Sequence, residues 1–226
     1  MNYTLIILGI ILILVLYVLY RFMYDRQTMV SSKVYLKDEP ADKSFEDLSN
    51  PESSRYSYNL WIYVVSLGSD QKIFEIDNGS GKYRFKLEVT TSGDLNYRLN
   101  TPSKNYSRGE ANYIISSNFP LQKWVCVSVS VDNNVVDTYL DGKLVKSQKM
   151  EGTQYTPLKT SKIVFGTGDI YLAEFERLAN PIDPQTAWDR YMAGNGGSYI
   201  SNSFAAYGAN LILTKDQVDM KKFSLF

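Results

Sequence analysis

The side chains with the clearest chemical potential are Glu75 and Asp77, which lie two residues apart in a stretch of strand-forming residues. In a β-strand such a pair points to one face. Glycoside hydrolases use paired carboxylates as nucleophile and general acid/base, and those with this motif on one strand add a third carboxylate. Here Gly79 and Ser80 stand in its place. We therefore predict a solvated strand face, no catalytic residue and no enzyme activity.

Composition limits the other catalytic chemistries. The chain of 226 residues has no histidine and one cysteine, Cys126. The absence of histidine excludes Ser-His-Asp and Cys-His catalysis and most transition-metal sites. With no histidine to activate it, Cys126 is expected to be an unreactive strand residue. We predict no cofactor.

Two binding chemistries stay open. Calcium takes Asp and Asn oxygens in loops, and turn propensity explains the same residues without a metal. The residues of this kind near predicted turns are Asp77, Asn78, Asp132, Asn133, Asp141 and Asp169. A sugar site needs aromatic rings beside polar groups. The tyrosines in or beside predicted loops, and so the candidate contacts for a sugar or a partner protein, are Tyr83, Tyr97, Tyr106 and Tyr113.

Charge gives no case for nucleic acid as a partner. The chain carries 24 basic and 24 acidic residues, so its net charge is zero. Nucleic-acid binding proteins usually show a clustered basic surface. We predict no nucleic-acid partner.

The elements that must position these residues are β-strands, and the clearest is a three-stranded meander. Apolar and small polar residues alternate from Val125 to Val131, the period of a strand with one buried face. Asn133-Asn134 and Asp141-Gly142 then supply two tight turns.

This meander resembles the laminin-G-like and concanavalin A-like jelly-roll family over residues 55–178. In that family a Trp opens a central strand, and an Asp-Gly turn closes the next strand after a Tyr. Trp124, Tyr139, Asp141 and Gly142 occupy those places. The resemblance implies an all-β, antiparallel jelly-roll β-sandwich, and it allows a carbohydrate-binding, lectin-like function.

Together with the meander, the spacing of the remaining apolar runs predicts about ten or eleven strands before the C-terminal tail. Besides the meander they are expected at Arg55–Val65, Lys72–Asp77, Lys82–Thr90, Asp94–Leu99, Tyr113–Ser116, Ser161–Phe165 and Ile170–Leu178. One short helix is predicted at about 184–193, with Asp183 as N-cap and Gly194 at its end. We expect this helix to cap one end of the sandwich.

The sequence of the tail after the helix predicts two further strands, one on each side of Lys215-Asp216. Because open sheet edges invite aggregation, Ala209–Leu213 is predicted to pair within the domain, beside a strand near Lys33–Lys37.

The N-terminus differs from the rest of the chain. Residues 1–20 carry no charged side chain, and about 20 apolar residues span a bilayer. The alternative, a cleaved signal peptide, lacks a basic n-region and a small-residue cleavage site. We predict a transmembrane anchor at 1–24, a polar tether at 25–54 and the sandwich domain at 55–226. Arg21 and Arg26 follow the span, which favours an exoplasmic N-terminus and a cytoplasmic domain.

Anchor, jelly roll and tail together are similar to virion proteins of large icosahedral algal DNA viruses. The tail residues that carry this likeness are the run from Trp188 to Gly197 and the ending Phe223-Ser-Leu-Phe226. The resemblance implies a minor capsid protein that ties an outer protein shell to an internal membrane, with the lipid bilayer and capsid proteins as partners. A non-enzymatic, membrane-anchored structural protein is thus the predicted function. A membrane-anchored lectin-like module, with the opposite topology, is the alternative.

Overall fold

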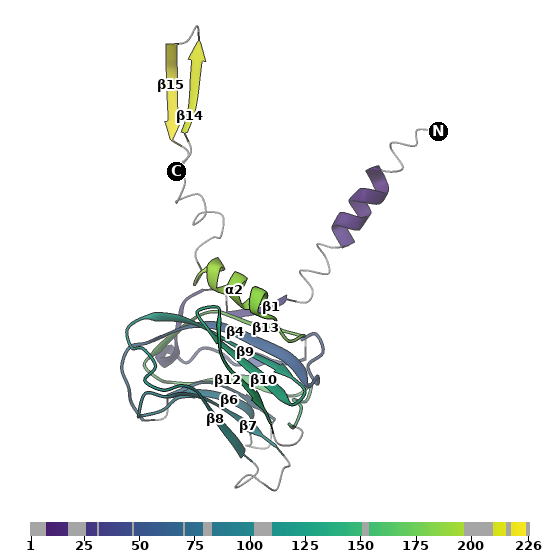
Figure 1. The fold of residues 1–226 in the computed structure, drawn as a ribbon, viewed down its shortest axis with the longest axis vertical. Helices are drawn as coiled ribbons and strands as arrows, with labels where there is room; N and C mark the ends of the chain where they lie inside the picture. The colour runs from purple at the N-terminus through teal and green to yellow at the C-terminus, as the bar shows by residue number, and fades with distance from the viewer. Residues whose placement is uncertain are drawn as a thin grey trace.

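A computed structural model describes residues 8–17, 26–30, 32–46, 48–69, 71–78, 83–101, 110–150, 154–196, 210–215 and 218–224 (Figure 1). Within the sandwich, two antiparallel sheets face one another. The seven-stranded sheet has the order β1 (Arg26–Val30), β13 (Ile170–Leu178), β4 (Arg55–Val64), β9 (Trp124–Asp132), β10 (Val135–Leu140) and β11 (Lys143–Lys149), with β2 (Val34–Tyr35) also paired to β13. The six-stranded sheet has the order β3 (Lys43–Ser44), β12 (Lys162–Phe165), β5 (Gln71–Asp77), β6 (Tyr83–Val89), β7 (Leu95–Asn100) and β8 (Glu110–Ser116). The predicted all-β sandwich is confirmed.

Aromatic rings fill the space between the sheets. Tyr58 from the seven-stranded sheet lies 5.1 Å from Phe74 and 5.4 Å from Phe85, centroid to centroid. Phe74 lies 4.7 Å from Phe175. All four side chains are fully buried. Burial of rings of this size supplies most of the apolar free energy of such a core.

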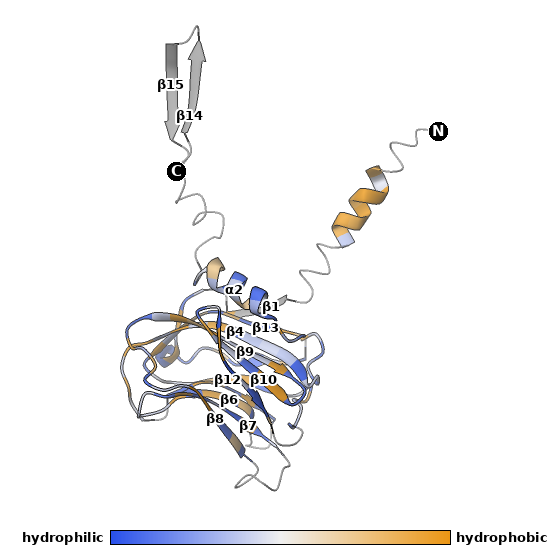
Figure 2. Cartoon of the chain, viewed as in Figure 1, coloured by the Kyte–Doolittle hydropathy of each residue, from blue (hydrophilic) through white to orange (hydrophobic). Residues whose placement is uncertain are grey.

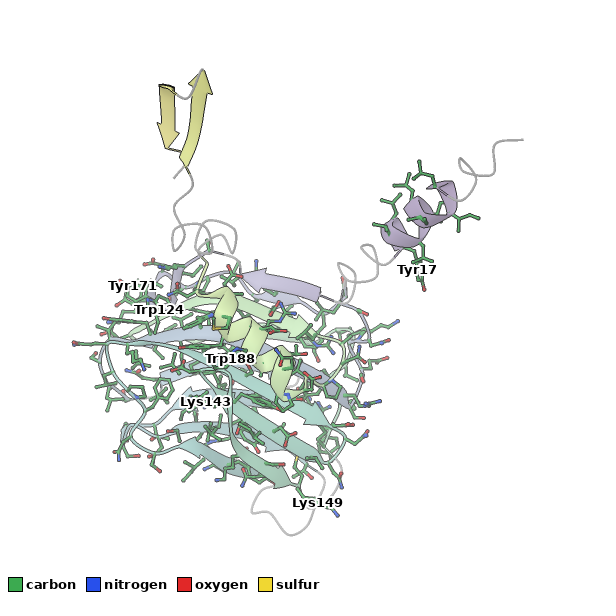
Figure 3. All side chains as sticks on the ribbon, turned by 45° about the horizontal axis from the view of Figure 1, so that its top comes forward. Tyr17, Trp124, Lys143, Lys149, Tyr171 and Trp188 are labelled. Atoms are coloured by element: carbon green, nitrogen blue, oxygen red, sulfur yellow. The ribbon has the colours of Figure 1, made fainter. Side chains whose placement is uncertain are left out.

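The meander forms as its alternation predicts. Val125, Val127, Val129 and Val131 point into the core. The intervening Cys126, Ser128 and Ser130 are buried too, which alternation with one buried face does not predict. The reason is the helix α2 (Pro184–Ala193), which covers the outer face of this sheet (Figure 3).

Helix α2 begins and ends where its capping residues predict. The carboxylate of Asp183 accepts a hydrogen bond from the backbone N–H of Thr186 at 2.7 Å. Tyr191 stacks on Trp61 of β4 with 5.8 Å between ring centroids. The prediction that the helix caps an end of the sandwich is therefore wrong, because this aromatic pair holds it across a face.

The predicted polar tether at 25–54 is wrong as well. It contributes β1, β2, β3 and the short 3-10 helix η1 (Leu36–Asp38) to the sandwich. Leu36 and Phe45 are fully buried, so these two side chains fix this mostly polar segment to the core. The edge strand expected near Lys33–Lys37 is present as β2.

Residues 8–17 form a helix whose side chains are almost all apolar (Figure 2). Among the helices that the structure describes, none has the length and apolarity to cross a bilayer. The rest of the predicted anchor, including Arg21, lies outside the described residues.

The tail forms two strands, as predicted, but with a different pairing. β14 (Asn210–Lys215) pairs with β15 (Val218–Ser224) in a separate two-stranded sheet. The predicted pairing of Ala209–Leu213 beside β2 is wrong: among the described residues β14 pairs with β15 alone, and β2 pairs with β13.

Candidate functional site

A row of aromatic side chains crosses the outer face of the seven-stranded sheet. Tyr35 on β2 lies opposite Tyr171 on β13, which in turn lies opposite Tyr63 on β4. Tyr63 lies opposite Trp124 on β9. Successive ring centroids are 4.5, 6.2 and 5.6 Å apart, within the range at which aromatic pairs attract each other. These four residues, on four adjacent strands, are called the aromatic row.

The row is open to solvent but firmly supported. Tyr171 is 38% exposed, and the other three rings are half-buried. On the side toward α2, Trp124 packs against the cluster that contains Trp61 and Tyr191. Figure 3 shows Tyr171 and Trp124 close together on the face that carries α2. The helix therefore bounds the row and stabilises its position.

A carboxylate is fixed at one end of the row. Asp169 accepts hydrogen bonds from the hydroxyls of Tyr35 and Ser66, both at 2.6 Å. The bonds from Ser66 and Tyr35, with Lys37 at 3.5 Å, hold the pKa of Asp169 below its ordinary value. The hydrogen bond to Asp169 raises the pKa of Tyr35. The site thus combines rings with an ionised acceptor.

Two lysines complete the surroundings of the row. The Nζ atom of Lys33 lies 5.4 Å from the ring centroid of Trp124, and that of Lys37 lies 5.8 Å from Tyr35. Both distances fit cation–π contacts. Rings with an acceptor and donors beside them are the groups that fix the orientation of a polar ligand with apolar faces.

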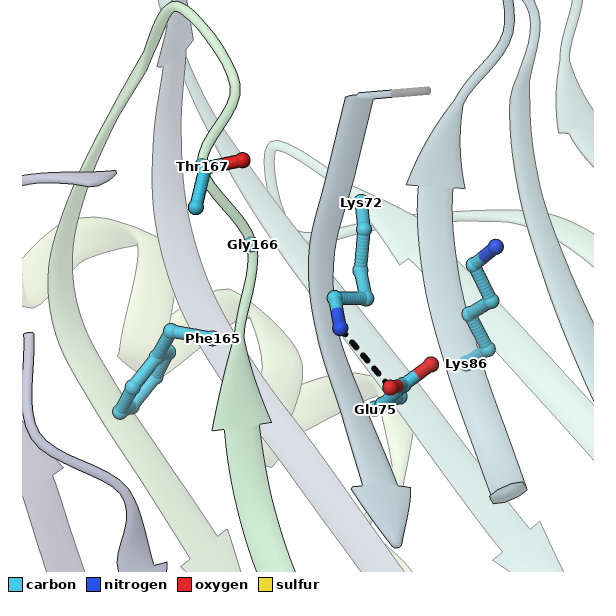
Figure 4. A pocket seen from close by; sticks show the side chains of 6 residues that line it. All are labelled: Lys72, Glu75, Lys86, Phe165, Gly166 and Thr167. Atoms are coloured by element: carbon cyan, nitrogen blue, oxygen red, sulfur yellow. Dashed lines mark hydrogen bonds and ion pairs between the residues drawn. The ribbon is translucent and has the colours of Figure 1, made fainter. Parts of the chain in front are cut away.

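A separate pocket of about 340 Å³ lies on the outer face of the six-stranded sheet (Figure 4). Lys72, Glu75, Lys86, Phe165, Gly166 and Thr167 line it. Glu75 accepts a hydrogen bond from the Nζ of Lys72 at 2.8 Å and lies opposite Lys86 across the strands.

That arrangement bears on the hydrolase motif. Glu75 and Asp77 do share the outer face, since Phe74 and Ile76, which alternate with them along β5, point into the core. A general acid needs a carboxyl group that keeps its proton near neutral pH. Glu75 is instead held in an ion pair with Lys72, at 2.8 Å between Nζ and the carboxylate oxygen.

Beneath α2 lies a polar layer. The amide oxygen of Asn59 accepts from the hydroxyl of Ser128 at 2.6 Å, and Arg190 of the helix pairs with Glu176 at 3.1 Å. The thiol of Cys126 lies in the same layer, and burial raises its pKa to about 12. A thiol with so high a pKa is a poor nucleophile at neutral pH, so the cysteine has a packing role.

The residues considered for calcium are spread over the molecule. Asp132 pairs with Arg55 at 3.0 Å, and the carboxylate of Asp141 accepts from the backbone N–H of Cys126 at 3.0 Å. Within the described residues no three carboxylate or thiol groups come together in a way that could hold a metal. The absence of a cofactor, with calcium left open by the sequence, stays a prediction.

Of the four tyrosines predicted from the sequence, the three that the structure describes do not form one site. Tyr97 is fully buried between the sheets, so the prediction that it contacts a ligand is wrong. Tyr113 stacks on it at 5.0 Å and packs against the core. Burial, followed by a hydrogen bond to Glu110, raises the pKa of half-buried Tyr83. Tyr106 lies outside the described residues.

The fold-signature residues have defined structural roles. Trp124 opens β9 and belongs to the aromatic row. Tyr139 is buried beside Ile182 and Ala187. Asp141 and Gly142 form a left-handed turn, with φ of 47° and 74°. The sequence prediction missed Tyr35, Tyr63 and Tyr171, because only the register of four strands places them beside Trp124.

Solved structures with the same fold include binding domains of toxins. The binding domain of Paraclostridial Mosquitocidal Protein 1 has a TM-score of 0.55 and 14% identity, over 75% of this chain and 46% of that one. The ligand binding domain of botulinum neurotoxin serotype D, solved with N-acetylneuraminic acid, has a TM-score of 0.54 and 14% identity, over 74% and 46%. This chain thus matches less than half of each domain. At such identity the likeness shows the fold alone.

Comparison with curated protein sequences gives no match. A family model, described as the concanavalin A-like lectin/glucanases superfamily, matches residues 40–200. The match includes β3, which the sequence analysis assigned to a tether, and it extends through α2. Together with the two-sheet architecture and the Asp-Gly turn, it shows that this chain belongs to the concanavalin A-like lectin/glucanase superfamily.

Proposed function

We propose that this chain is a non-enzymatic, lectin-like module and that it binds carbohydrate at the aromatic row. The observation that carries the proposal is the row itself, with the ionised acceptor Asp169 at its end. A pyranose presents C–H groups on its faces and hydroxyls around its rim. The aromatic rings can pack against the C–H groups. Asp169, Lys33 and Lys37 can form hydrogen bonds with the hydroxyls.

The comparisons support this class of ligand at a coarse level. The superfamily includes lectins, and the serotype D domain was solved in complex with N-acetylneuraminic acid. Less than half of that domain corresponds to this chain, so the likeness does not locate the sugar in the shared part.

A binding measurement with matched variants tests the proposal. Full-length protein in mild detergent is screened on a glycan array, and the best glycan is titrated by isothermal calorimetry. Tyr171→Ala should weaken binding about fivefold to tenfold, since one aromatic contact contributes about 1 kcal/mol. Tyr155→Ala is the control, because Tyr155 is similarly exposed, at 41% against 38%, but lies outside the row. Equal affinity of both variants for the glycan would contradict the proposal.

A second function, that of a membrane tether, rests on a different observation. The apolar side chains of residues 8–17 are exposed by 47 to 69%, an arrangement that soluble surfaces avoid. We propose that the N-terminal segment binds a lipid bilayer and holds the domain beside it. In the finer form of this proposal the protein is a minor capsid protein, with the domain facing the shell and capsid proteins as partners.

Two assays separate these functions. Flotation of the full chain with liposomes, and its loss when residues 1–24 are removed, tests membrane attachment. Protease protection in sealed vesicles tests topology, since a surface lectin needs the domain outside and the structural linker needs it on the cytoplasmic side. Absence of the protein from purified virus particles would exclude the capsid form.

A further inference from the structure

We propose that the pocket on the six-stranded sheet is a second binding site, distinct from the aromatic row, and that it takes a small hydroxylated ligand with one anionic group. The pocket lies between β5, β6 and the loop that joins β12 to β13 (Figure 4). Its volume of about 340 Å³ is within the range of small-molecule sites. The aromatic row is on the outer face of the other sheet, so the two sites do not share residues.

Charge determines the class of ligand. The cluster on this face joins Lys72 to Glu75 at 2.8 Å and Lys86 to Glu88 at 2.7 Å, and Arg98 also pairs with Glu88. Among the residues that line the pocket, the two lysines meet one carboxylate, Glu75, so the lining itself carries one positive charge in excess. The lysine side chains are only 24% and 21% exposed, so solvent screens them less than it screens lysines at the free surface. An anionic group placed between the two lysines would balance the cluster.

The wall of the pocket is formed by close packing of the backbone. Gly166 donates its N–H to the carbonyl oxygen of Ile73 at 3.0 Å. A Cβ atom on Gly166 would collide with the carbonyl oxygen of Lys72, so only glycine allows this approach. Thr167 follows at the rim, exposed, with its hydroxyl turned toward Lys72 in Figure 4. Thr167 can therefore exchange hydrogen bonds with a ligand hydroxyl beside the anionic group.

Three probes test this site with the full chain in mild detergent: glucuronate, glucose 6-phosphate and glucose. Saturation-transfer NMR and calorimetry should show binding of at least one of the two anions, and glucose should bind at least tenfold more weakly. Preference between the anions assigns the group as carboxylate or phosphate. Raising the salt concentration should weaken anion binding, because the attraction is electrostatic.

Variants then locate the site. Lys86→Met keeps the aliphatic stem and removes the charge, so it should weaken anion binding about tenfold or more. Thr167→Val, which preserves shape, should weaken it about threefold to tenfold. Lys143→Met, at an exposed lysine of β11, should have no effect.

The outcome is independent of the glycan proposal. Tyr171→Ala should leave anion binding unchanged, and Lys86→Met should leave glycan binding at the row unchanged. Two results would overturn the second site: glucose binding as tightly as both anions, or anion binding that survives both Lys86→Met and Thr167→Val.

Discussion

Replacement of Gly142 by alanine tests how α2 is held on the sandwich. Gly142 has a φ of 74°, and alanine in this left-handed region costs about 1–2 kcal/mol. A Cβ atom here would also lie 3.0 Å from Cα and Cε3 of Trp188 and 3.1 Å from Cβ of Tyr191, so α2 must shift. Overpacking of this kind costs about 1–3 kcal/mol. We expect the free energy of unfolding to fall by about 2–5 kcal/mol.

Gly93 provides a matched control. Its φ of 84° imposes a similar backbone strain, but an added Cβ would meet only Leu67 at an ordinary 3.4 Å. Gly93→Ala should therefore lower the free energy of unfolding by about 1–2 kcal/mol. Urea denaturation of both variants, in the same detergent, gives the difference. Near-ultraviolet circular dichroism should change only in Gly142→Ala, because the Trp61–Tyr191 stack moves with the helix. Equal losses and unchanged spectra would refute the packing of α2 on this turn.

Three further predictions concern buried and charged groups. Arg177 is buried and donates to the carbonyl oxygens of Ser49 and Asn50, so Arg177→Met should lower the free energy of unfolding measured in urea by about 1–3 kcal/mol, because both acceptors lose their charged donor; an unchanged free energy of unfolding would contradict this. Cys126, with its pKa raised to about 12, should react with iodoacetamide at about pH 8 only after unfolding, as mass spectrometry would show; rapid labelling of native protein would disprove its burial. Asp169 has a lowered folded pKa, so it stabilises the fold above the ordinary aspartate pKa, and this contribution disappears as pH falls through the lowered value. The Tm of Asp169→Asn should thus lie below that of the natural chain at neutral pH and match it in strong acid; a gap that persists in acid would refute the linkage.

Most strands could be predicted because their signals are local. The predicted Arg55–Val65 differs from β4 by one residue at its end, and α2 begins at Pro184 as its N-cap predicts. The alternation of residues along β7 also indicates the correct position of Tyr97. Tyr97 shares a face of the strand with Leu95 and Leu99, so it belongs in the core. Its proximity to a predicted loop favoured the wrong interpretation.

The parts that could not be predicted depend on contacts distant in sequence. Leu36 and Phe45 lie in a segment that is mostly polar, and only the sandwich supplies the core that buries them. The aromatic row needs Tyr35 on a strand of two residues to lie opposite Tyr171, which is 136 positions later. No periodicity encodes that pairing. The pocket at Lys72 and Lys86 likewise depends on the register of β5 and β6.

Binding of carbohydrate by the aromatic row can be tested in a single titration experiment. Intact protein, Tyr171→Ala and Tyr155→Ala are titrated in parallel with the glycan that binds best on the array. We predict that Tyr171→Ala loses about fivefold to tenfold in affinity while Tyr155→Ala keeps the affinity of the intact protein. The absence of any bound glycan, or an unchanged affinity in Tyr171→Ala, would contradict it.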